Sequence, residues 1–396
     1  MKKIVSIIGG GTAGLFVAAF LDPKLFDISI YEKKSSFGRK FLVAGDGGLN
    51  LSHAENMDDF KLRYTPETFL TKSLDQFNNE DMRKWLLSIG IPTFVGSSKR
   101  VFPEKGIKPI TVLENIKSHL SNNKIGFEFN KEFTGWGENN SLIFNSDETI
   151  KSDYTIFALG GASWKITGSD GKWLNIFSEK GIKTIPFKAA NCAFEVGWSD
   201  EFITKHKGTP LKNISCFFQD QHQKGEAVIT EFGLEGNAIY ALSPKIQAEL
   251  ASKNEVLVEV DFKPSMTFDI LLKKLLSSNQ NTSQAMRNIF KLSAAQISLI
   301  KKHLTKEAFL DASTLIKTIK RFPLKIIGSA PIDEAISTSG GIDINAVDEN
   351  FELIKLKNNF TIGEMVDWNA PTGGYLIQAC ASMGVSLART LNSRYF

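Results

Sequence analysis

Three glycines near the N-terminus have the spacing G-x-G-x-x-G, namely Gly9, Gly11 and Gly14. In this pattern the first glycine permits a tight turn, the second lets the backbone approach a pyrophosphate, and the third lets a helix pack closely on a strand. Glu32 follows 18 residues after Gly14, and a carboxylate there can accept hydrogen bonds from a ribose diol. These residues indicate binding of the adenosine half of NAD or FAD.

The elements that must position these residues are a strand, a turn, a helix and a second strand. The apolar run at 4–8 predicts a buried parallel strand, and 15–21 predicts a helix. Thr12 and Ala13 lie where the first N–H groups and the positive dipole end of that helix would face the phosphates. The acid at Glu32, after the second strand, favours a free 2′-hydroxyl. A glycine-rich turn without a ligand is the alternative.

A loop at 37–53 follows, with four glycines and two bases. It is long enough to wrap a bound cofactor and would place Arg39 or Lys40 near its phosphates. Asn50 can hydrogen-bond a ring or ribityl atom of that cofactor, although a role in a turn is equally compatible with its position. A solvated basic loop without a ligand is the alternative for the whole stretch.

The run at 154–157 predicts a strand that leads into small residues, Ala158, Gly160 and Gly161. Small residues at this point can carry the chain close beneath a bound dinucleotide. An ordinary strand followed by a turn is the alternative.

A further stretch near the C-terminus favours a flavin. Gly363, Glu364 and Asp367 precede the pair Gly373 and Gly374, and apolar residues at roughly the 3.6 period then predict a helix. The N-terminus of such a helix suits the N1/C2 carbonyl edge of a flavin, where negative charge builds up on reduction. The carboxylate of Asp367 can bind ribityl hydroxyls.

With these stretches in this order, the chain resembles the HI0933-like family of bacterial FAD-dependent oxidoreductases over nearly its whole length. The resemblance also places Lys33, in the stretch YEK, at the cofactor. Two positions depart from the family pattern: 47–50 is GGLN where many members have GRCN, and 233–237 is GLEGN where many have a GSGP-like turn. The matching stretches are IIGGGTAGL, YEK, GRKFLVAGDGGLNLSH, RVFP, ALGGASW, TSGGI and GEMVDWNAPTGGY.

The resemblance implies an α/β fold with a Rossmann-like FAD-binding domain of the two-dinucleotide-binding-fold type. A small β-barrel and a helical insert would interrupt that domain. The patterns agree, because β-forming residues dominate after 189 and spacings typical of helices follow 264. The expected boundaries are 1–185 and 338–396 for the FAD-binding domain, 186–262 and 321–337 for the β-barrel, and 263–320 for the helical insert.

Two side chains are candidate catalytic groups. His53 ends the 37–53 loop and can donate a proton near the flavin, although a capping or core histidine is the commoner case. Tyr375 follows the glycine pair and can flank the isoalloxazine or pack in the core. The tryptophans Trp164, Trp173 and Trp368 are expected mostly in the core.

The function that fits best is an FAD-dependent oxidoreductase. It would transfer hydride through flavin N5 between NAD(P)H and an unknown small organic substrate, as the reductase of an unsaturated or conjugated compound. The sequence has no clear second G-x-G-x-x-G for a nicotinamide, so either NAD(P)H would bind transiently or another reductant would serve. The alternatives are an amine or alcohol oxidase, a flavin-dependent RNA-modifying enzyme, and a non-catalytic redox sensor.

Composition bounds the remaining partners. The 396 residues carry a formal net charge of +4, which we take as spread along the chain, and this argues against a nucleic-acid partner. The three cysteines lie far apart with no CxxC, so neither a metal site nor a disulfide framework is expected. No stretch has the length of a membrane span, and the N-terminal apolar run breaks at the glycines, which argues against a signal peptide. A cytoplasmic protein is expected, with no indication of its oligomeric state.

Overall fold

The protein is described here from a computed structural model that places residues 1–44 and 48–395. Residues 45–47 of the 37–53 loop lie outside that description. The chain divides into two compact units, one made of 1–189 with 332–396 and the other of 190–331. Each unit has its own cluster of buried apolar side chains.

A five-stranded parallel sheet is the centre of the first unit. Its order is β20, β10, β1, β2, β6, and every neighbouring pair is parallel. The strands are buried because runs such as Ile-Val-Ser-Ile-Ile supply apolar residues to both faces of the sheet. Their bounds are β1 (Lys3–Ile8), β2 (Phe26–Glu32), β6 (Gly126–Phe129), β10 (Tyr154–Phe157) and β20 (Asn359–Thr361).

The strand order reverses at β1, since β2 and β6 lie on one side of it and β10 and β20 on the other. In an open parallel sheet a ligand binds outside the carboxyl ends of the strands at such a switch point. Here that point is where β1 ends at Ile8 and β10 ends at Phe157, which are direct partners in the sheet.

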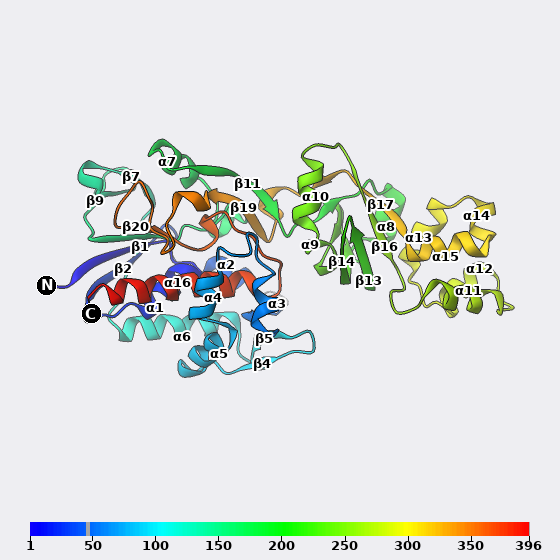
Figure 1. The fold of residues 1–396 in the computed structure, drawn as a ribbon, viewed down its shortest axis with the longest axis horizontal. Helices are drawn as coiled ribbons and strands as arrows, with labels where there is room; N and C mark the ends of the chain where they lie inside the picture. The colour runs from blue at the N-terminus through cyan, green and yellow to red at the C-terminus, as the bar shows by residue number, and fades with distance from the viewer. Residues whose placement is uncertain (45–47, 396) are drawn as a thin grey trace. The chain divides into compact units, whose positions relative to one another are not determined.

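Two helices, α1 (Thr12–Phe20) and α16 (Tyr375–Ser393), pack against each other in this unit, although they come from the beginning and the end of the chain (Figure 1). They approach closely at Gly384. A Cβ there would lie 2.8 Å from the Val17 nitrogen and 2.9 Å from the Ala13 oxygen. A residue with a side chain at 384 would therefore push the two helices apart.

The other elements of the first unit surround this layer. They include two three-stranded antiparallel sheets and the pair formed by β11 and β19. Their bounds are α2 (Arg39–Ala44), β3 (Ser52–His53), α3 (Met57–Lys61), α4 (Thr71–Gln76), α5 (Asn79–Ser88), β4 (Thr93–Val95), β5 (Arg100–Pro103), α6 (Pro109–Asn122), β7 (Phe133–Trp136), β8 (Leu142–Phe144), β9 (Glu148–Ile150), α7 (Trp173–Glu179), β11 (Thr184–Ala190) and β19 (Ser337–Ile342).

The second unit holds a seven-stranded sheet whose printed pairs are antiparallel, in the order β17, β16, β13, β14, β15, β12, β18. The two ends of this order, β17 and β18, are separated in the chain by Ile327 alone, so they are neighbouring parts of one segment. A closed barrel stays a prediction. The bounds are β12 (Phe194–Glu195), β13 (Pro210–Phe218), β14 (Gln221–Ile229), β15 (Gly233–Glu235), β16 (Val256–Asp261), β17 (Phe322–Ile326) and β18 (Gly328–Ser329).

Helices follow β16 in the second unit and share its apolar core, to which Leu271, Ile300 and Leu315 contribute. Five of them begin at side-chain caps, Thr267, Asn281, Ser293, Thr305 and Asp311. The helices of this unit are α8 (Asp200–His206), α9 (Asn237–Tyr240), α10 (Ser243–Leu250), α11 (Phe268–Leu276), α12 (Thr282–Asn288), α13 (Ala294–His303), α14 (Lys306–Leu310) and α15 (Ala312–Lys320).

The charge of the chain is not spread evenly, and the expectation that it is was wrong. Residues 263–320 contain ten Lys and Arg against three Asp and Glu, a net +7. Since the whole chain carries +4, the remaining residues carry −3. The small total excess of base therefore hides a strongly basic helical segment. Among the described residues, no helix is long and apolar enough to cross a membrane.

Candidate functional site

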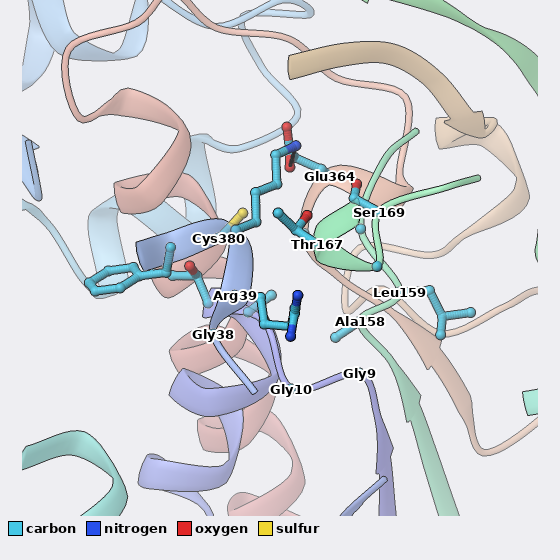
Figure 2. Close-up of a pocket in the computed structure, with 18 of the residues that line it drawn as sticks. Gly9, Gly10, Gly38, Arg39, Ala158, Leu159, Thr167, Ser169, Glu364 and Cys380 are labelled. Atoms are coloured by element: carbon cyan, nitrogen blue, oxygen red, sulfur yellow. Dashed lines mark hydrogen bonds and ion pairs between the residues drawn. The ribbon is translucent and has the colours of Figure 1, made fainter. Parts of the chain in front are cut away.

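A cavity of about 600 Å³ opens at the switch point of the parallel sheet, within the first unit (Figure 2). It is bounded by the ends of β1 and β10 and by the N-terminal ends of α1 and α16. Residues from the stretches 8–13, 31–50, 131–133, 158–176 and 362–380, together with Ile336, meet there. Those expected at a cofactor that do line it are Gly9, Gly11, Thr12, Ala13, Glu32, Lys33, Arg39, Lys40, Asn50, Ala158, Gly160, Gly363, Glu364, Gly373 and Gly374.

The three glycines of the N-terminal motif have different surroundings. Gly9 has a φ of +108°, and a Cβ there would lie 2.3 Å from the Ala158 oxygen. A Cβ on Gly14 would lie 2.1 Å from the Gly9 oxygen, so the turn and helix α1 could not pack as they do. A Cβ on Gly11 would meet no atom within 4 Å. Gly9 and Gly14 therefore shape the turn, and Gly11 leaves open space beside the cavity.

Glu32, at the end of β2, holds the turn in place. Its Oε2 accepts a hydrogen bond from the Gly10 N–H at 2.9 Å, and its Oε1 accepts one from the Lys34 N–H at 2.9 Å. Each carboxylate oxygen can accept a second hydrogen bond, so the side chain can still bind a hydroxyl group. The acid links the glycine turn to the second strand and also faces the cavity.

Four residues around the cavity carry a buried polar atom that has no hydrogen-bond partner among the described residues. These atoms are Arg39 Nε, Asn50 Oδ1, Ser169 Oγ and Glu364 Oε1. Figure 2 shows Arg39 directed toward the cavity, with Ser169 and Glu364 also bordering it. Buried polar atoms in folded proteins nearly always have partners, so this group has the composition expected where a polar ligand binds.

Three of the five basic residues that line the same cavity contact other parts of its wall. Lys40 Nζ donates to Glu364 Oε2 at 3.1 Å and to Ser163 Oγ at 2.9 Å. Lys33 pairs with Asp170 at 2.9 Å. Arg39 contacts the Ile166 oxygen at 3.4 Å. These contacts tie the segment around Ser163–Asp170 to the β2 end of the cavity and leave positive charge beside it.

The N-termini of both helices open into the cavity without side-chain caps. Gly11 precedes α1 and Gly374 precedes α16, and neither offers a side-chain oxygen to the first N–H groups. Gly374 has a φ of +101°, and a Cβ there would lie 2.5 Å from the Ser52 oxygen. Two sets of free backbone donors, each at the positive end of a helix dipole, therefore face one space.

Four of the expected cofactor-binding residues do not line the cavity. They are Gly14, Gly161, Asp367 and Tyr375. Gly161 packs against Thr338, whose Oγ1 would lie 2.2 Å from an added Cβ. Asp367 accepts a hydrogen bond from the Gly340 N–H at 2.7 Å, and this bond uses its carboxylate to hold the chain near β19. These four residues therefore lie outside the lining of the cavity.

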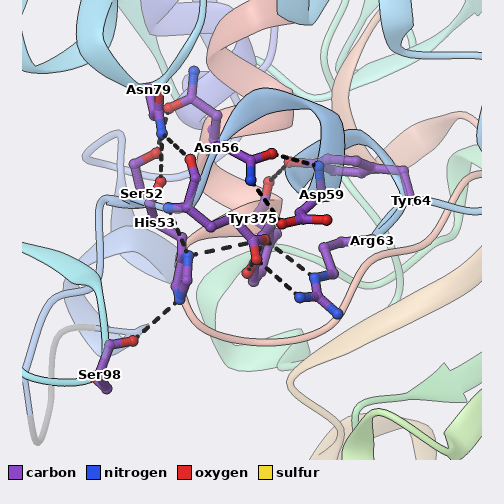
Figure 3. A network of polar contacts seen from close by, with 11 residues as sticks. Ser52, His53, Asn56, Asp59, Arg63, Tyr64, Asn79, Ser98 and Tyr375 are labelled. Atoms are coloured by element: carbon purple, nitrogen blue, oxygen red, sulfur yellow. Dashed lines mark hydrogen bonds and ion pairs between the residues drawn. The ribbon is translucent and has the colours of Figure 1, made fainter.

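His53 and Tyr375, the candidate catalytic groups, lie together in a polar network beside the cavity and do not line it (Figure 3). Their rings stack with centroids 5.1 Å apart. His53 Nε2 donates to the Ser98 oxygen at 3.2 Å, and Nδ1 accepts from the Glu55 N–H at 3.3 Å. Both ring nitrogens are therefore satisfied in the neutral imidazole. A catalytic role for either residue stays a prediction.

The centre of this network is the buried carboxylate of Glu55. The Tyr375 hydroxyl donates to its Oε1 at 2.5 Å, and Arg63 binds it through two hydrogen bonds of 3.1 and 2.9 Å. Burial would raise the pKa of Glu55, but the hydrogen bonds from Arg63 and Tyr375 outweigh it and hold that pKa below its ordinary value. Burial lowers the pKa of His53, so its neutral form is favoured.

Some cavity residues escaped the sequence analysis. Thr167 and Ser169 line the wall opposite Arg39, and Trp164 and Trp173 also face the space. Trp164, expected in the core, is 36% exposed with a left-handed φ of +63°. The run of glycines around Ser169 was visible in the sequence. It gave no distinction, however, between a cofactor wall and an ordinary loop.

One family model matches almost the whole chain. The model described as the HI0933-like protein Rossmann domain matches residues 3–390. The chain belongs to this family. It is an FAD-dependent oxidoreductase with a Rossmann-type α/β fold, as expected from its motifs. Among the described residues, no group of three or more His, Cys, Asp and Glu side chains could hold a metal ion.

Two curated relatives match this chain over almost its full length. A 3-dehydro-bile acid delta(4,6)-reductase of Clostridium scindens is 24% identical, with 98% of this chain and 99% of the relative covered. A ribosomal RNA dihydrouridine synthase of Haemophilus influenzae is 22% identical, with 98% of each covered. A solved 3-ketosteroid delta1-dehydrogenase of Sterolibacterium denitrificans shares the fold, with 10% identity, a TM-score of 0.53 and coverage of 99% and 100%.

Proposed function

We propose that this flavoprotein reduces a carbon–carbon double bond conjugated to a carbonyl group, with NADH or NADPH as the electron donor. The observation that carries the proposal is the cavity itself, where two uncapped helix N-termini and an open glycine turn meet four buried polar atoms that lack partners among the described residues. FAD, when bound, supplies the relay of hydride from the donor to the substrate.

The cavity residues suit the parts of such a dinucleotide. The first N–H groups of α1 and the open face of Gly11 suit the pyrophosphate, with Arg39 adding a charged donor. The free acceptor sites of Glu32 suit ribose hydroxyls. The N-terminus of α16 suits the pyrimidine edge of the isoalloxazine, because its dipole stabilises negative charge there. Asn50 and Glu364 offer unpartnered acceptors to the remaining polar groups.

The substrate class follows from what the two relatives have in common. A 3-dehydro bile acid with delta(4,6) unsaturation has double bonds conjugated to a 3-oxo group. Dihydrouridine is uridine with its carbonyl-conjugated ring double bond saturated. Both reductions add a hydride to the electrophilic carbon of a double bond conjugated to a carbonyl and a proton to the other carbon of that bond. The electrophilic carbon accepts hydride because the carbonyl withdraws electrons from it through the conjugated system.

The side chains of the protein would mainly orient the substrate and the cofactor, and FAD would transfer the hydride. Lys40, held by Glu364 and Ser163, places positive charge beside the cavity. The network of Glu55, Arg63 and Tyr375 fixes the first turn of α16 behind it. His53 remains a candidate proton donor if substrate binding brings a group to its ring, and water is the alternative donor.

The test is an anaerobic absorbance titration of the purified holoprotein. Addition of NADH or NADPH should bleach the long-wavelength flavin band, and a 3-oxo-4-ene steroid or uridine should then restore it. The product should be two mass units heavier than the substrate. If the flavin stays oxidised with both nucleotides but is bleached by an amine or alcohol, the reductase proposal is wrong and the protein is an oxidase.

An RNA-modifying reductase is the second candidate, and the two ribosomal RNA dihydrouridine synthases of Haemophilus influenzae and Escherichia coli favour it. It uses the same chemistry on a uracil base carried by a polymer. The cavity does not distinguish the two, because a steroid ring and a uracil ring present the same conjugated group. Turnover of ribosomal RNA transcripts, with free uridine and the steroid as competitors, would separate them.

A further inference from the structure

The charge of the second unit gives evidence on what carries the reduced double bond. Eight exposed bases belong to the segment 263–320, and we call them the basic helical surface. Among the described residues, none of the eight lies within ion-pair distance of a carboxylate. They are Lys273, Lys274, Arg287, Lys291, Lys301, Lys302, Lys306 and Lys317. The two other bases of the segment, Lys263 and Lys320, are half-buried and bind backbone oxygens.

The three acids of the same segment do not neutralise this surface. Asp269 and Glu307 lie in the first turns of α11 and α14, and Asp311 caps α15 by accepting from the Thr314 N–H at 2.7 Å. Carboxylates at these positions are accounted for by the helix dipole. The eight exposed bases minus these three exposed acids leave a net charge of +5 facing solvent.

Helix stability does not account for all of the bases. Lysines in the last turns of α11, α13 and α15 do stabilise those helices. Lys306, however, is the first residue of α14, where a positive charge opposes the dipole. Lys291 has a left-handed φ of +52°, a conformation that Gly or Asn adopts at lower cost. Helix stability therefore explains neither base, since the charge of Lys306 opposes the dipole of its helix and Lys291 lies outside the helices.

We propose that the basic helical surface binds the phosphate backbone of RNA. This proposal rests on the proposed function, since it makes a uracil base in RNA the carrier of the double bond. A polymer with one phosphate per nucleotide matches unpaired bases that are spread over several helices and their connecting loops. An anionic membrane is the other polyanion, but it favours bases along one amphipathic helix with an apolar face, and these bases are divided among α11, α12, α13, α14 and α15.

The test is fluorescence anisotropy of the holoprotein with a fluorescein-labelled single-stranded RNA of mixed sequence, measured in low and in fourfold higher salt. With about four phosphate contacts, the affinity should fall roughly 50-fold over that salt range. The variant Lys291→Gln, Lys302→Gln, Lys306→Gln and Lys317→Gln should lose most of the binding. A second variant, Lys273→Gln, Lys274→Gln, Arg287→Gln and Lys301→Gln, covers the rest of the surface should the first fail to fold.

The matched control removes four exposed lysines from the first unit, with Lys105→Gln, Lys108→Gln, Lys124→Gln and Lys151→Gln. Equal loss of RNA binding in the control would overturn the proposal, because the effect would then follow total charge. Binding to phosphatidylglycerol vesicles without binding to RNA would also overturn it, as would RNA binding that is insensitive to salt. The anisotropy measurement needs no turnover, so it tests RNA binding even if the protein proves inactive as a reductase. Conversely, a lack of RNA binding would leave the reductase proposal intact.

Discussion

The hydroxyl of Tyr375 donates a hydrogen bond of 2.5 Å to Oε1 of Glu55, across 320 positions of the sequence. It joins the first residue of α16 to the loop after β3, and the same carboxylate holds Arg63. Tyr64 adds a second bond to this place, since its hydroxyl donates to the Tyr375 oxygen at 2.9 Å. These hydrogen bonds thus anchor the N-terminus of α16, which faces the cavity.

Tyr375→Phe should lower the free energy of unfolding by about 1–3 kcal/mol, because it removes a donor from a buried carboxylate. Urea denaturation of the wild type and the variant measures this difference. Tyr154→Phe is the matched control, since its hydroxyl pairs with Tyr395 near the surface and should cost less. Equal losses in the two variants would show that the Glu55 contact is not special.

Stability should fall with acid because of His53. Its folded pKa lies below the unfolded value of about 6.5, so the unfolded chain binds the extra proton. The stability is fully present above 6.5 and is lost as the pH falls through the folded pKa. His53→Asn should flatten the curve of unfolding free energy between pH 7 and 5. Glu55, also lowered, acts in the same direction below its ordinary pKa of about 4.3. An unchanged slope in the variant would contradict the assignment.

Two alanine substitutions in the glycine turn should fail in different ways. Gly14→Ala places a Cβ 2.1 Å from the Gly9 oxygen, so the protein should be destabilised although alanine favours helices. Gly11→Ala meets open space, so folding should be nearly unchanged while FAD affinity falls at least tenfold. Thermal melting of the apoprotein and FAD titration by fluorescence separate the two. Normal FAD binding by Gly11→Ala would exclude a close approach of the cofactor at that residue.

Arg39→Ala and Ser169→Ala should each weaken FAD binding, by about tenfold or more for the charged donor. Ser169→Ala removes a buried atom that lacks a partner among the described residues, and Arg39→Ala removes one such atom and a long 3.4 Å contact to the Ile166 oxygen, so the melting temperature of the apoprotein should change little. Lys108→Ala, an exposed substitution away from the cavity, is the control. A large loss of apoprotein stability in Ser169→Ala would indicate a structural role for its hydroxyl.

The three cysteines should be unreactive in the folded protein. Burial raises the pKa of Cys192 to about 11 and that of Cys216 to about 12, and it also raises the pKa of Cys380. The thiolate is the reactive form, so a thiol reagent at mildly alkaline pH should count no fast-reacting group. All three should react in guanidinium. A fast thiol in the native protein would contradict the burial of these side chains.

Local patterns predicted the strand and helix on either side of the glycine motif well. The strand expected at 4–8 is β1 at Lys3–Ile8, and the helix expected at 15–21 is α1 at Thr12–Phe20. Such elements follow from the spacing of apolar residues and glycines within a short window. The position of Ser169 in the cavity wall did not follow from local patterns, because it depends on contacts between distant parts of the chain. No local pattern says which loop will lie opposite Arg39.

Side-chain direction was harder to predict than position in the chain. Tyr375 and His53 stand beside cavity residues in the sequence, yet both turn into the network of Glu55. The Asp367 carboxylate accepts a hydrogen bond from the Gly340 N–H and does not line the cavity. Adjacency placed these residues within a few ångströms of the site. The partner that each side chain finds comes from another part of the chain, and one sequence does not reveal it.

The crossing of α1 and α16 at Gly384 has a consequence for the order of events during synthesis. The glycine turn at 9–14 precedes the second unit in the chain, whereas its companion helix follows that unit and ends at Ser393. The ribosome must therefore complete the second unit between them. Until residues 375–393 have been made, a newly made chain has only one of the two helices that bound the cavity. We expect the flavin to be captured only after that point, and a protein truncated before residue 375 should stay colourless.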